Sequence, residues 1–445
     1  MARLARMTAT PAPPVPAPPG AAPYPGAGRK RVIWLGLLIA FCAVASIAVV
    51  AFLGWRIGPG PLAVGLIGAL VPVPVLIGAF LWLDRYQPSP MWILVVSFLW
   101  GAGVATSGAL AVNTGASILF EEWGWPDGLV GVLVAPFIEE LLKAAFPLLL
   151  FFFYRRAYTG IIDGIVYCGI SATGFAMVEN ILYLGDRGFA SGLETGPVTG
   201  AFLALTVFLL RVPLTGFAHP LFTSMTGIAL GIAARSPRRW VRAIVPFVGL
   251  FLAMVLHGSW NLMAWLAQDQ PYFILYGYVA VFVPLFCAMV GGAIWVRSWE
   301  GRLAERVLPI YSAAGWFSPP EVAALGTLGR RLSARKWAKR VGGDVGAVAM
   351  RSYQYAATRL ALLRDGIDRG LYRRDLGKAV AEERALLEGI DAARRAFTGL
   401  DPMTPRARWT GAGYELEFPD GVVRPIGAPP LPVVPVPFPL AIPQR

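Results

Sequence analysis

Eight runs of apolar residues follow one another in this chain, and each is long enough to cross a lipid bilayer. A helix rises 1.5 Å per residue, so about 20 apolar residues span a hydrocarbon core of about 30 Å. The runs occupy approximately residues 32–55, 61–83, 91–112, 129–153, 161–185, 199–234, 241–266 and 272–297. The sequence therefore predicts an all-α fold, a polytopic membrane bundle of about eight transmembrane helices.

The composition supports a membrane protein and argues against a nucleic-acid-binding one. Of the 445 residues, 56% are hydrophobic and 15% are charged, which is more apolar surface than one soluble core can bury. The net charge is +13, but the basic residues gather in the tails and in short loops, where they orient a membrane protein. We expect the lipid bilayer as a partner, and no nucleic acid. Cys42, Cys168 and Cys287 lie singly in apolar runs and predict neither disulfides nor a thiolate metal site.

The run from 199 to 234 leaves its number of crossings open. It exceeds the length of one crossing, and Pro213, Gly216 and Pro220 interrupt its middle. A single crossing places the basic clusters and the basic C-terminal segment on the cytoplasmic side, as the positive-inside rule requires, whereas two crossings move the C-terminus outside. We therefore predict a broken or re-entrant segment that crosses once, in a multi-pass protein of the cell membrane with both termini cytoplasmic.

Shifts in composition divide the chain into four regions. Residues 1–28 form a Pro- and Ala-rich tail predicted to be disordered, and residues 29–297 form the transmembrane domain that carries the candidate site. Residues 298–400 are rich in Arg, Glu, Ala and Leu at helical spacing and predict a small soluble helical region, in which one helix begins at Ser318. Residues 401–445 form a mostly disordered Pro-rich tail. We expect the helical region to bind a cytoplasmic partner or lipid.

Three ionisable residues interrupt the fourth apolar run, in the sequence APFIEELLKAAF. Glu139 and Glu140 lie one helical turn from Lys143, at i+4 and i+3, so they can pair with it. A lone charge at the bilayer centre costs about 2.5–3.5 kcal/mol, so three unpaired charges would cost about 8–10 kcal/mol, comparable to a fold's whole stability of about 5–15 kcal/mol. A purely structural ion pair explains two of the charges and leaves one carboxylate over. We therefore predict a functional site in this run.

The fifth run adds another acid, in the sequence GFAMVENILYL. Phe175 and Glu179 share a helix face at i, i+4, and Asn180 follows the acid. Glu179 and Asn180 are candidate site residues, although a capped glutamate near the membrane interface would give the same pattern.

The chain has only two histidines, and both lie in apolar runs. His219 lies at the break of the sixth run, and His257 has Asn261 on the same helix face at i+4. A single histidine in a membrane helix is often a hydrogen-bonded packing residue, but two of them together with intramembrane acids indicate a site. For Arg211 we expect snorkelling or pairing with an acid.

These residues fit a buried hydrolytic site in an intramembrane protease. Peptide hydrolysis needs an activated water, a stabilised oxyanion and a proton for the leaving amine. One of Glu139 and Glu140 can act as the base while the other stays protonated or pairs with Lys143. The alternatives are a proton-coupled transporter, since intramembrane Glu, Lys and His beside a Pro-broken helix are also typical of carriers, and a non-catalytic membrane scaffold.

The motifs resemble those of the PrsW-type intramembrane proteases, in the broader group that includes the CAAX-processing prenyl endopeptidases. The resemblance covers about residues 60–297, and the segment LDRYQPSP at 83–90 looks like a cytoplasmic loop of actinobacterial members. It implies a metallopeptidase that clips a membrane-anchored protein, such as an anti-sigma factor-like regulator. The family's EExxK, FxxxEN and two histidine motifs are similar to Glu139, Glu140 and Lys143, to Phe175, Glu179 and Asn180, and to the segments of His219 and His257.

The resemblance leaves two mechanisms open. In the metal version His219, His257 and Glu179 bind one Zn²⁺, and a glutamate of the first motif acts as base. In the metal-free version, which the CAAX endopeptidases suggest, a glutamate activates water while His257 and Asn261 bind the oxyanion. Those enzymes carry a histidine where this chain has Glu179, so its mechanism can differ from theirs. We expect catalytic roles for Glu139, Glu140, Lys143, Glu179, Asn180, His219, His257 and Asn261, with zinc as the expected cofactor.

Overall fold

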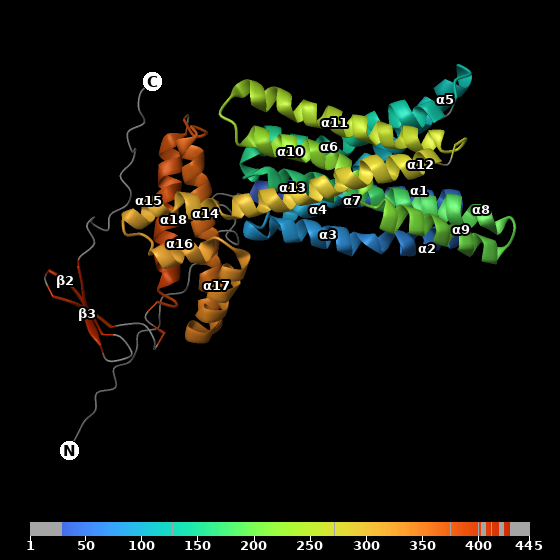
Figure 1. Ribbon diagram of the computed structural model, residues 1–445. Coiled ribbons are helices and arrows are strands. Elements are labelled where there is room, and N and C mark those ends of the chain that lie inside the picture. Colours follow the sequence, from blue (N-terminus) through green and yellow to red (C-terminus); the bar gives the residue numbers. More distant parts are fainter. Residues whose placement is uncertain are drawn as a thin grey trace. The chain divides into compact units, whose positions relative to one another are not determined.

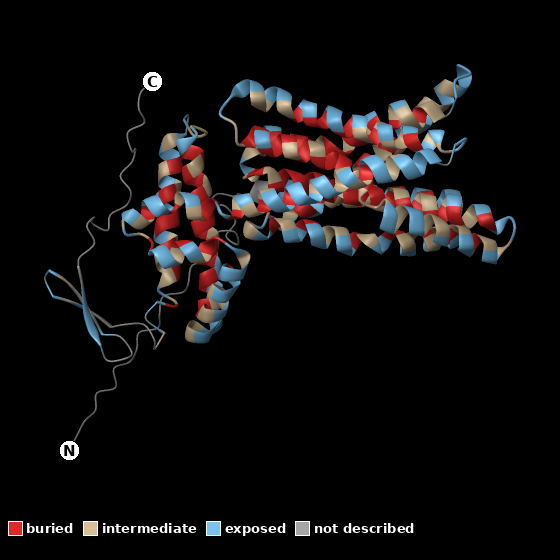
Figure 2. Cartoon of the chain, viewed as in Figure 1, coloured by how far each residue is buried: buried red, intermediate tan, exposed pale blue. Residues whose placement is uncertain are grey.

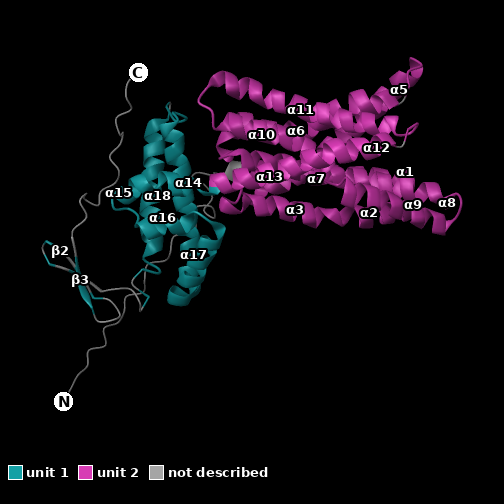
Figure 3. Ribbon diagram, in the orientation of Figure 1, with its two compact units in different colours: residues 1–25, 301–445 teal, residues 26–300 magenta. Residues whose placement is uncertain are grey.

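The chain forms two compact units, shown in different colours in Figure 3. One unit comprises residues 26–300 and the other comprises residues 301–445 together with residues 1–25. The structure is a computed structural model, and it describes residues 29–427 except 127, 271, 374, 399, 402–405, 411 and 418–421. The disorder predicted for residues 1–28 and for the end of the Pro-rich tail lies outside the described residues.

The unit of residues 26–300 is a bundle of helices lying side by side (Figure 1). Several of its helices contain an internal proline or adjoin a short π-helical turn, and such turns are common near functional sites. Its helices are α1 Arg29–Ile57, α2 Pro59–Leu70, α3 Pro72–Leu83, α4 Met91–Leu99, α5 Thr106–Glu122, α6 Ala135–Tyr154, α7 Ile161–Leu182, α8 Ser191–Leu193, α9 Pro197–Leu209, α10 Ala218–Ala234, α11 Arg239–Leu266, α12 Tyr272–Gly277 and α13 Val283–Gly301.

Large apolar side chains cover the outside of this bundle. Trp34, Trp55 and Val198, for example, are 70%, 82% and 83% exposed, and Figure 2 shows exposed residues along the outer helices. Soluble proteins rarely expose contiguous apolar surface of this extent, whereas lipid solvates it. By length and composition, seven described segments can cross a membrane: Val32–Ile57, Pro59–Tyr86, Met91–Glu122, Ile161–Leu193, Pro197–Ala234, Arg239–Leu266 and Tyr272–Ala313. The prediction of an all-α polytopic membrane bundle is confirmed.

Helix α6, the main part of the predicted fourth run, is the expected span that is missing from these seven. It is 20 residues long, but Glu139, Glu140 and Lys143 interrupt its apolar sequence. All three are buried, and α6 packs against α5, α7, α10 and α11. Its charged residues therefore lie within the bundle, as intramembrane charges must.

Helices α7 and α10 pack closely because glycines meet at their contact. The carbonyl oxygen of Gly227 in α10 leaves no room for a Cβ atom at Gly164 in α7. Further along the chain, Gly192 in α8 also lies close to Gly200 in α9. Small residues allow this close backbone approach in membrane helices. The fifth and sixth apolar runs are thus antiparallel neighbours along their whole length. The sixth run crosses the bundle once, and the turn between α9 and α10 interrupts it.

The unit of residues 301–445 has a helical part with its own hydrophobic core, centred on Leu308, Tyr311, Leu360 and Ile390. Ser318 begins a helix, as predicted, through a reciprocal capping box with Glu321. Its helices are α14 Leu303–Val307, α15 Pro309–Ala313, α16 Pro319–Leu325, α17 Leu328–Asp368 and α18 Leu376–Arg394. A small antiparallel sheet in the order β1-β2-β3 follows, within the region predicted to be mostly disordered, with β1 Arg406–Trp409, β2 Gly413–Glu417 and β3 Val423–Gly427.

Candidate functional site

Five helices, together with the turn after α9, bring polar side chains to one place inside the unit of residues 26–300. Every predicted ionisable site residue lies in this cluster, although the residues are up to 118 positions apart (257 − 139). Helix α5 provides Asn113, α6 provides Glu139, Glu140 and Lys143, α7 provides Glu179 and Asn180, the turn after α9 provides Arg211, α10 provides His219 and Thr223, and α11 provides His257.

The ammonium group of Lys143 lies at the centre of the cluster. Its Nζ is 2.8 Å from Oε1 of Glu140, 2.9 Å from Nδ1 of His219 and 3.4 Å from Oε2 of Glu139. The Nζ also lies 4.3 Å from the centre of the Phe175 ring, where a cation is attracted to the aromatic face. The ammonium is hydrogen-bonded to Glu140 and His219, while Glu139 lies at ion-pair distance without a hydrogen bond to it. The ion pair predicted from the helical spacing thus extends to a histidine on another helix.

Glu140 is the fully engaged carboxylate of the cluster. Its Oε1 accepts from Lys143 and lies 3.0 Å from Nδ1 of His257, and its Oε2 accepts from the Thr223 hydroxyl at 2.7 Å. The side chain has no exposed surface. Hydrogen bonds to a charged group are the strong ones in protein interiors. Glu140 therefore ties α6 to α10 and α11, and it has little freedom to react.

Glu139, its neighbour in sequence, is bonded much less. Its Oε1 accepts from Nδ2 of Asn113 at 3.3 Å, whereas among the described residues no group donates a hydrogen bond to its Oε2. That oxygen lies 3.4 Å from Nζ of Lys143 and 3.8 Å from Nε2 of His257. A buried carboxylate oxygen without a hydrogen bond is costly and calls for a reason. Glu139 thus has a buried oxygen that is available for chemistry.

Glu179 pairs with two cationic or potentially cationic partners. Its Oε2 accepts from Nη2 of Arg211 at 2.6 Å and lies 2.7 Å from Nε2 of His219. Nε of Arg211 also donates to Oδ1 of Asn180 at 3.2 Å, and the guanidinium lies 3.5 Å from the centre of the Tyr183 ring. Arg211 therefore pairs with an acid, one of the two arrangements expected from sequence.

The partners of each histidine assign its tautomer. Nδ1 of His219 faces the ammonium of Lys143, which can only donate, so Nδ1 accepts and Nε2 carries the proton toward Glu179. Nδ1 of His257 faces the carboxylate of Glu140 and carries the proton, so Nε2 keeps its lone pair. A carboxylate behind each ring is the arrangement that orients metal-binding histidines.

Three side chains of the cluster can reach a common metal ion. One ligand atom each from Glu139, His219 and His257 lie within 4.8 Å of one another. Two imidazoles and a carboxylate are a donor set of catalytic zinc sites, and the unbonded Oε2 of Glu139 fits this role. The sequence-based ligand set differs because it contained Glu179, whose Oε2 is instead occupied by Arg211 and His219. A metal held by His219 must displace either Lys143 or Glu179 from that ring.

Three other residues refine the predicted site. Nδ2 of Asn261 donates to the backbone oxygen of Gly131 at 2.7 Å, which ties α11 to the segment before α6. Asn113 and Thr223 contact the acids but were absent from the sequence-based set. The polar amide of Asn113 in an apolar run was an available signal, whereas a threonine in a membrane helix is too ordinary to stand out.

Comparisons with known proteins agree with the motifs. The profile of the PrsW family intramembrane metalloproteases matches residues 89–289, which contain the whole cluster. Protease PrsW of Clostridioides difficile (strain 630) is 27% identical over 219 residues, covering 48% of this chain and 84% of that protein. Protease PrsW of Geobacillus kaustophilus (strain HTA426) is 27% identical over 210 residues, covering 44% and 78%. No solved structure matches this chain significantly.

Proposed function

We propose that the chain is an intramembrane metalloprotease of the PrsW type, whose family profile matches residues 89–289, and that Glu139, His219 and His257 form its hydrolytic centre. The match supports a membrane protease over the transporter and scaffold alternatives. The observation that carries the proposal is the unbonded Oε2 of Glu139, which lies beside His257 while two other acids hold the two histidine rings.

Zinc is the metal that this donor set fits. We propose His219, His257 and Glu139 as its ligands, because their ligand atoms converge within 4.8 Å and a His, His, Glu set is typical of catalytic zinc. When bound, zinc would polarise the scissile carbonyl and make an attacking water more acidic. A metal bound to His219 would replace either Lys143 at Nδ1 of that ring or Glu179 at its Nε2. The contact between Lys143 and Glu140 can remain.

The remaining acids act on the histidines. Glu140 holds His257 with Nε2 free of a proton, and Glu179 holds His219 with Nδ1 free of a proton. Fixed rings lose little entropy when they bind a metal or substrate. Asn180 and Arg211 keep Glu179 in place, and Asn261 positions α11 through Gly131.

Glu139 contacts the reacting water in both mechanisms. As a metal ligand, Glu139 would lie next to the water that attacks the peptide bond. Without a metal, its Oε2 takes the proton of the attacking water and returns it to the leaving amine. In the metal-free version Nε2 of His257 lies 3.8 Å from that oxygen, and it donates toward the oxyanion only after it has gained a proton of its own, because Nδ1 keeps its proton on Glu140. Asn113, which holds Oε1 of Glu139, leaves Oε2 pointing toward His257 in either case.

The substrate follows from where the cluster lies. Because its acids and histidines are carried by helices with apolar outer surfaces, a peptide bond must enter the hydrocarbon region to reach them. We propose a membrane-anchored protein as the substrate, an anti-sigma factor-like regulator being one candidate. We place the protein in the cell membrane with both termini cytoplasmic, on the basis of its loop charges.

Cleavage of a single-pass membrane substrate tests the proposal. The purified protein in lipid nanodiscs should cut such a substrate, and Glu139→Gln should abolish cutting while Glu122→Gln, at the exposed end of α5, should not. Chelation should remove activity, Zn²⁺ should restore it, and metal analysis should give about one zinc per chain. Full activity in a zinc-free preparation would eliminate the metal version, and unchanged cutting by the Glu139→Gln variant would eliminate the proposed centre.

A further inference from the structure

The unit of residues 301–445 contains an open groove that proteolysis does not explain. Its volume is about 1000 Å³, and its walls come from α16, α17 and the residues just after α18. Pockets for small ligands and cofactors generally have volumes of about 300–1000 Å³, so this groove can hold a larger ligand such as a stretch of peptide. It lies outside residues 89–289, the part of the chain that matches the protease family.

A sharp turn inside α17 builds the groove. Gly343 has φ +62°, a left-handed conformation that favours glycine, and it separates α17 into two arms. Nε of Arg335 on the first arm donates to Oε1 of Gln354 on the second at 2.7 Å, and Nε2 of Gln354 donates to the backbone oxygen of Arg331 at 2.9 Å. The two arms are thus bonded to each other. These bonds fix the shape of the groove, and a preorganised site reduces the cost of binding.

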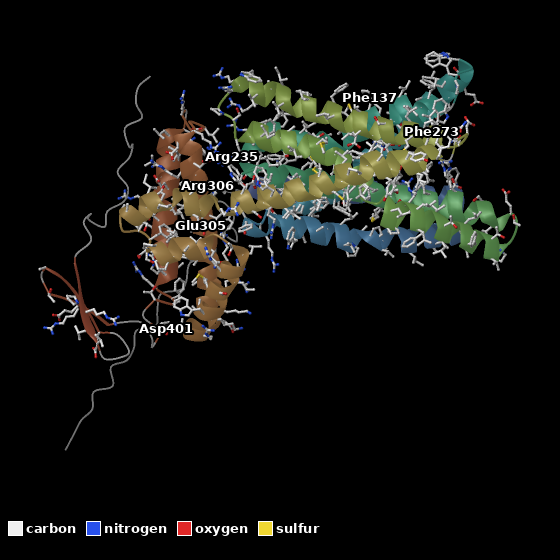
Figure 4. The ribbon with its side chains drawn as sticks, viewed as in Figure 1. Phe137, Arg235, Phe273, Glu305, Arg306 and Asp401 are labelled. Atoms are coloured by element: carbon white, nitrogen blue, oxygen red, sulfur yellow. The ribbon has the colours of Figure 1, made fainter. Side chains whose placement is uncertain are left out.

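Three aromatic rings line the groove. The ring centres of Trp337 and Phe397 are 5.6 Å apart at 72°, and those of Tyr353 and Phe397 are 6.0 Å apart at 88°. Phe397 and Tyr353 are buried and form the floor, whereas Trp337 is only half-buried. Nε1 of Trp337 donates to Oδ2 of Asp401 at 2.7 Å, which fixes the indole. Asp401 is labelled in Figure 4. Because Tyr353 and Phe397 are only 3% and 4% exposed, Trp337 is the ring of the three that offers an apolar face to a ligand.

Two of the three charged side chains that line the groove are already paired. Arg330 forms an ion pair with Glu305 at 3.0 Å, and Glu321 forms one with Arg394 at 2.8 Å. Arg340 also lines the groove, and among the described residues no acid pairs with it. Recognition by Arg330 or Glu321 would require breaking an existing pair, so most of the available contacts are apolar.

We propose that this groove binds the Pro-rich segment of residues 428–445 of the same chain. The segment contains seven prolines in 18 residues, and its only charged side chain is Arg445. Proline-rich segments favour the polyproline II helix, which has three residues per turn, so Pro429, Pro432 and Pro435 fall on one edge. Aromatic-lined grooves recognise such helices, because the extended backbone loses little entropy on binding.

The connection along the chain favours this segment over other proline-rich ligands. Asp401, bonded to Trp337 at the groove, begins the stretch that leads through the sheet to residue 428. A polyproline II helix of 18 residues is about 56 Å long, which is ample reach. Such a tether gives an effective concentration in the millimolar range. The other Pro-rich segment, within residues 1–28, is joined to the groove only through the whole of residues 29–300.

Photo-crosslinking in the full-length protein tests the contact. We replace Phe438 by p-benzoylphenylalanine, irradiate the protein in nanodiscs that hold one chain each, and map the crosslinked peptides by mass spectrometry. We expect crosslinks to the groove peptides around residues 320–337 and 397, reduced at least fivefold by Trp337→Ala but not by Leu332→Ala. Leu332 lies on the same arm, is 51% exposed and does not line the groove. Crosslinks confined to other regions would overturn the proposal.

Competition by a peptide provides a second, independent measurement. A fluorescent synthetic peptide of residues 428–445 should bind the chain lacking these residues about tenfold more tightly than the intact chain, whose own segment occupies the groove. Replacing Pro429, Pro432 and Pro435 by Ala in the peptide should weaken binding at least fivefold. Equal affinity for the two chains would refute occupation by the tethered segment. Stronger competition by a peptide of residues 9–28 would assign the groove to the other Pro-rich segment and would also refute the proposal.

Discussion

Glu139 and Glu140 are adjacent in sequence, yet neutralising them should have different consequences. Glu140→Gln removes a buried carboxylate that Lys143, His257 and Thr223 contact at 2.8, 3.0 and 2.7 Å. The amide group of the new glutamine must face at least one of these donors, and the ammonium loses its closest counter-charge. Breaking a buried ion pair on one side costs about 3–5 kcal/mol.

Glu139→Gln should cost much less stability. It affects the 3.3 Å bond from Asn113 and the 3.4 Å contact with Lys143, while Oε2 of Glu139 has no hydrogen bond to lose among the described residues. The expected loss is about 1 kcal/mol, the value of an ordinary hydrogen bond. Activity should nevertheless fall at least about 100-fold, because loss of a general acid or base typically costs about 10²–10⁴.

Thermal unfolding and cleavage of the same purified variants measure both effects. Each kcal/mol shifts the unfolding temperature by about 2–4 °C in domains of 150–250 residues, so Glu140→Gln should lower it by about 10 °C and Glu139→Gln by about 2–4 °C. Intrinsic tryptophan fluorescence follows the transition, and Glu122→Gln serves as the control for both assays. Equal thermal shifts for the two variants would refute the division into one structural and one reactive carboxylate.

Three further variants probe the same geometry. Asn113→Ala should lower kcat about tenfold while KM changes less than twofold, because Asn113 orients Glu139 and not the whole substrate. Steady-state cleavage rates measure both constants, and a change in KM alone would contradict the prediction. Lys143→Met should destabilise the metal-free protein by about 3–5 kcal/mol, and Zn²⁺ should recover most of the loss in a thermal melt, whereas no recovery would oppose the metal version. Gly227→Val should prevent α7 and α10 from packing and should abolish folded protein in size-exclusion chromatography, while Gly291→Val, at a position with open space around its Cα, should fold normally.

The sequence alone determined the membrane architecture and the chemical content of the site. Runs of about 20 apolar residues have few alternatives to membrane helices, so the all-α bundle followed from length and composition. The pairing of Lys143 with Glu139 and Glu140 followed from i+4 and i+3 spacing, because both contacts lie within one helix. The cost of charge in lipid also indicated that the remaining acids and histidines would find partners inside the bundle.

Contacts between helices could not be read from such local rules. Tertiary packing decided that Glu140 is saturated by His257 and Thr223 while Glu139 keeps an unbonded oxygen, although the two acids are neighbours in sequence. Tertiary packing also pairs Glu179 with Arg211 and His219, and it brings Glu139 into the candidate metal group instead. The physical reason is that helical periodicity fixes the face on which a side chain lies, whereas the rotation and depth of the neighbouring helix decide which atom it meets.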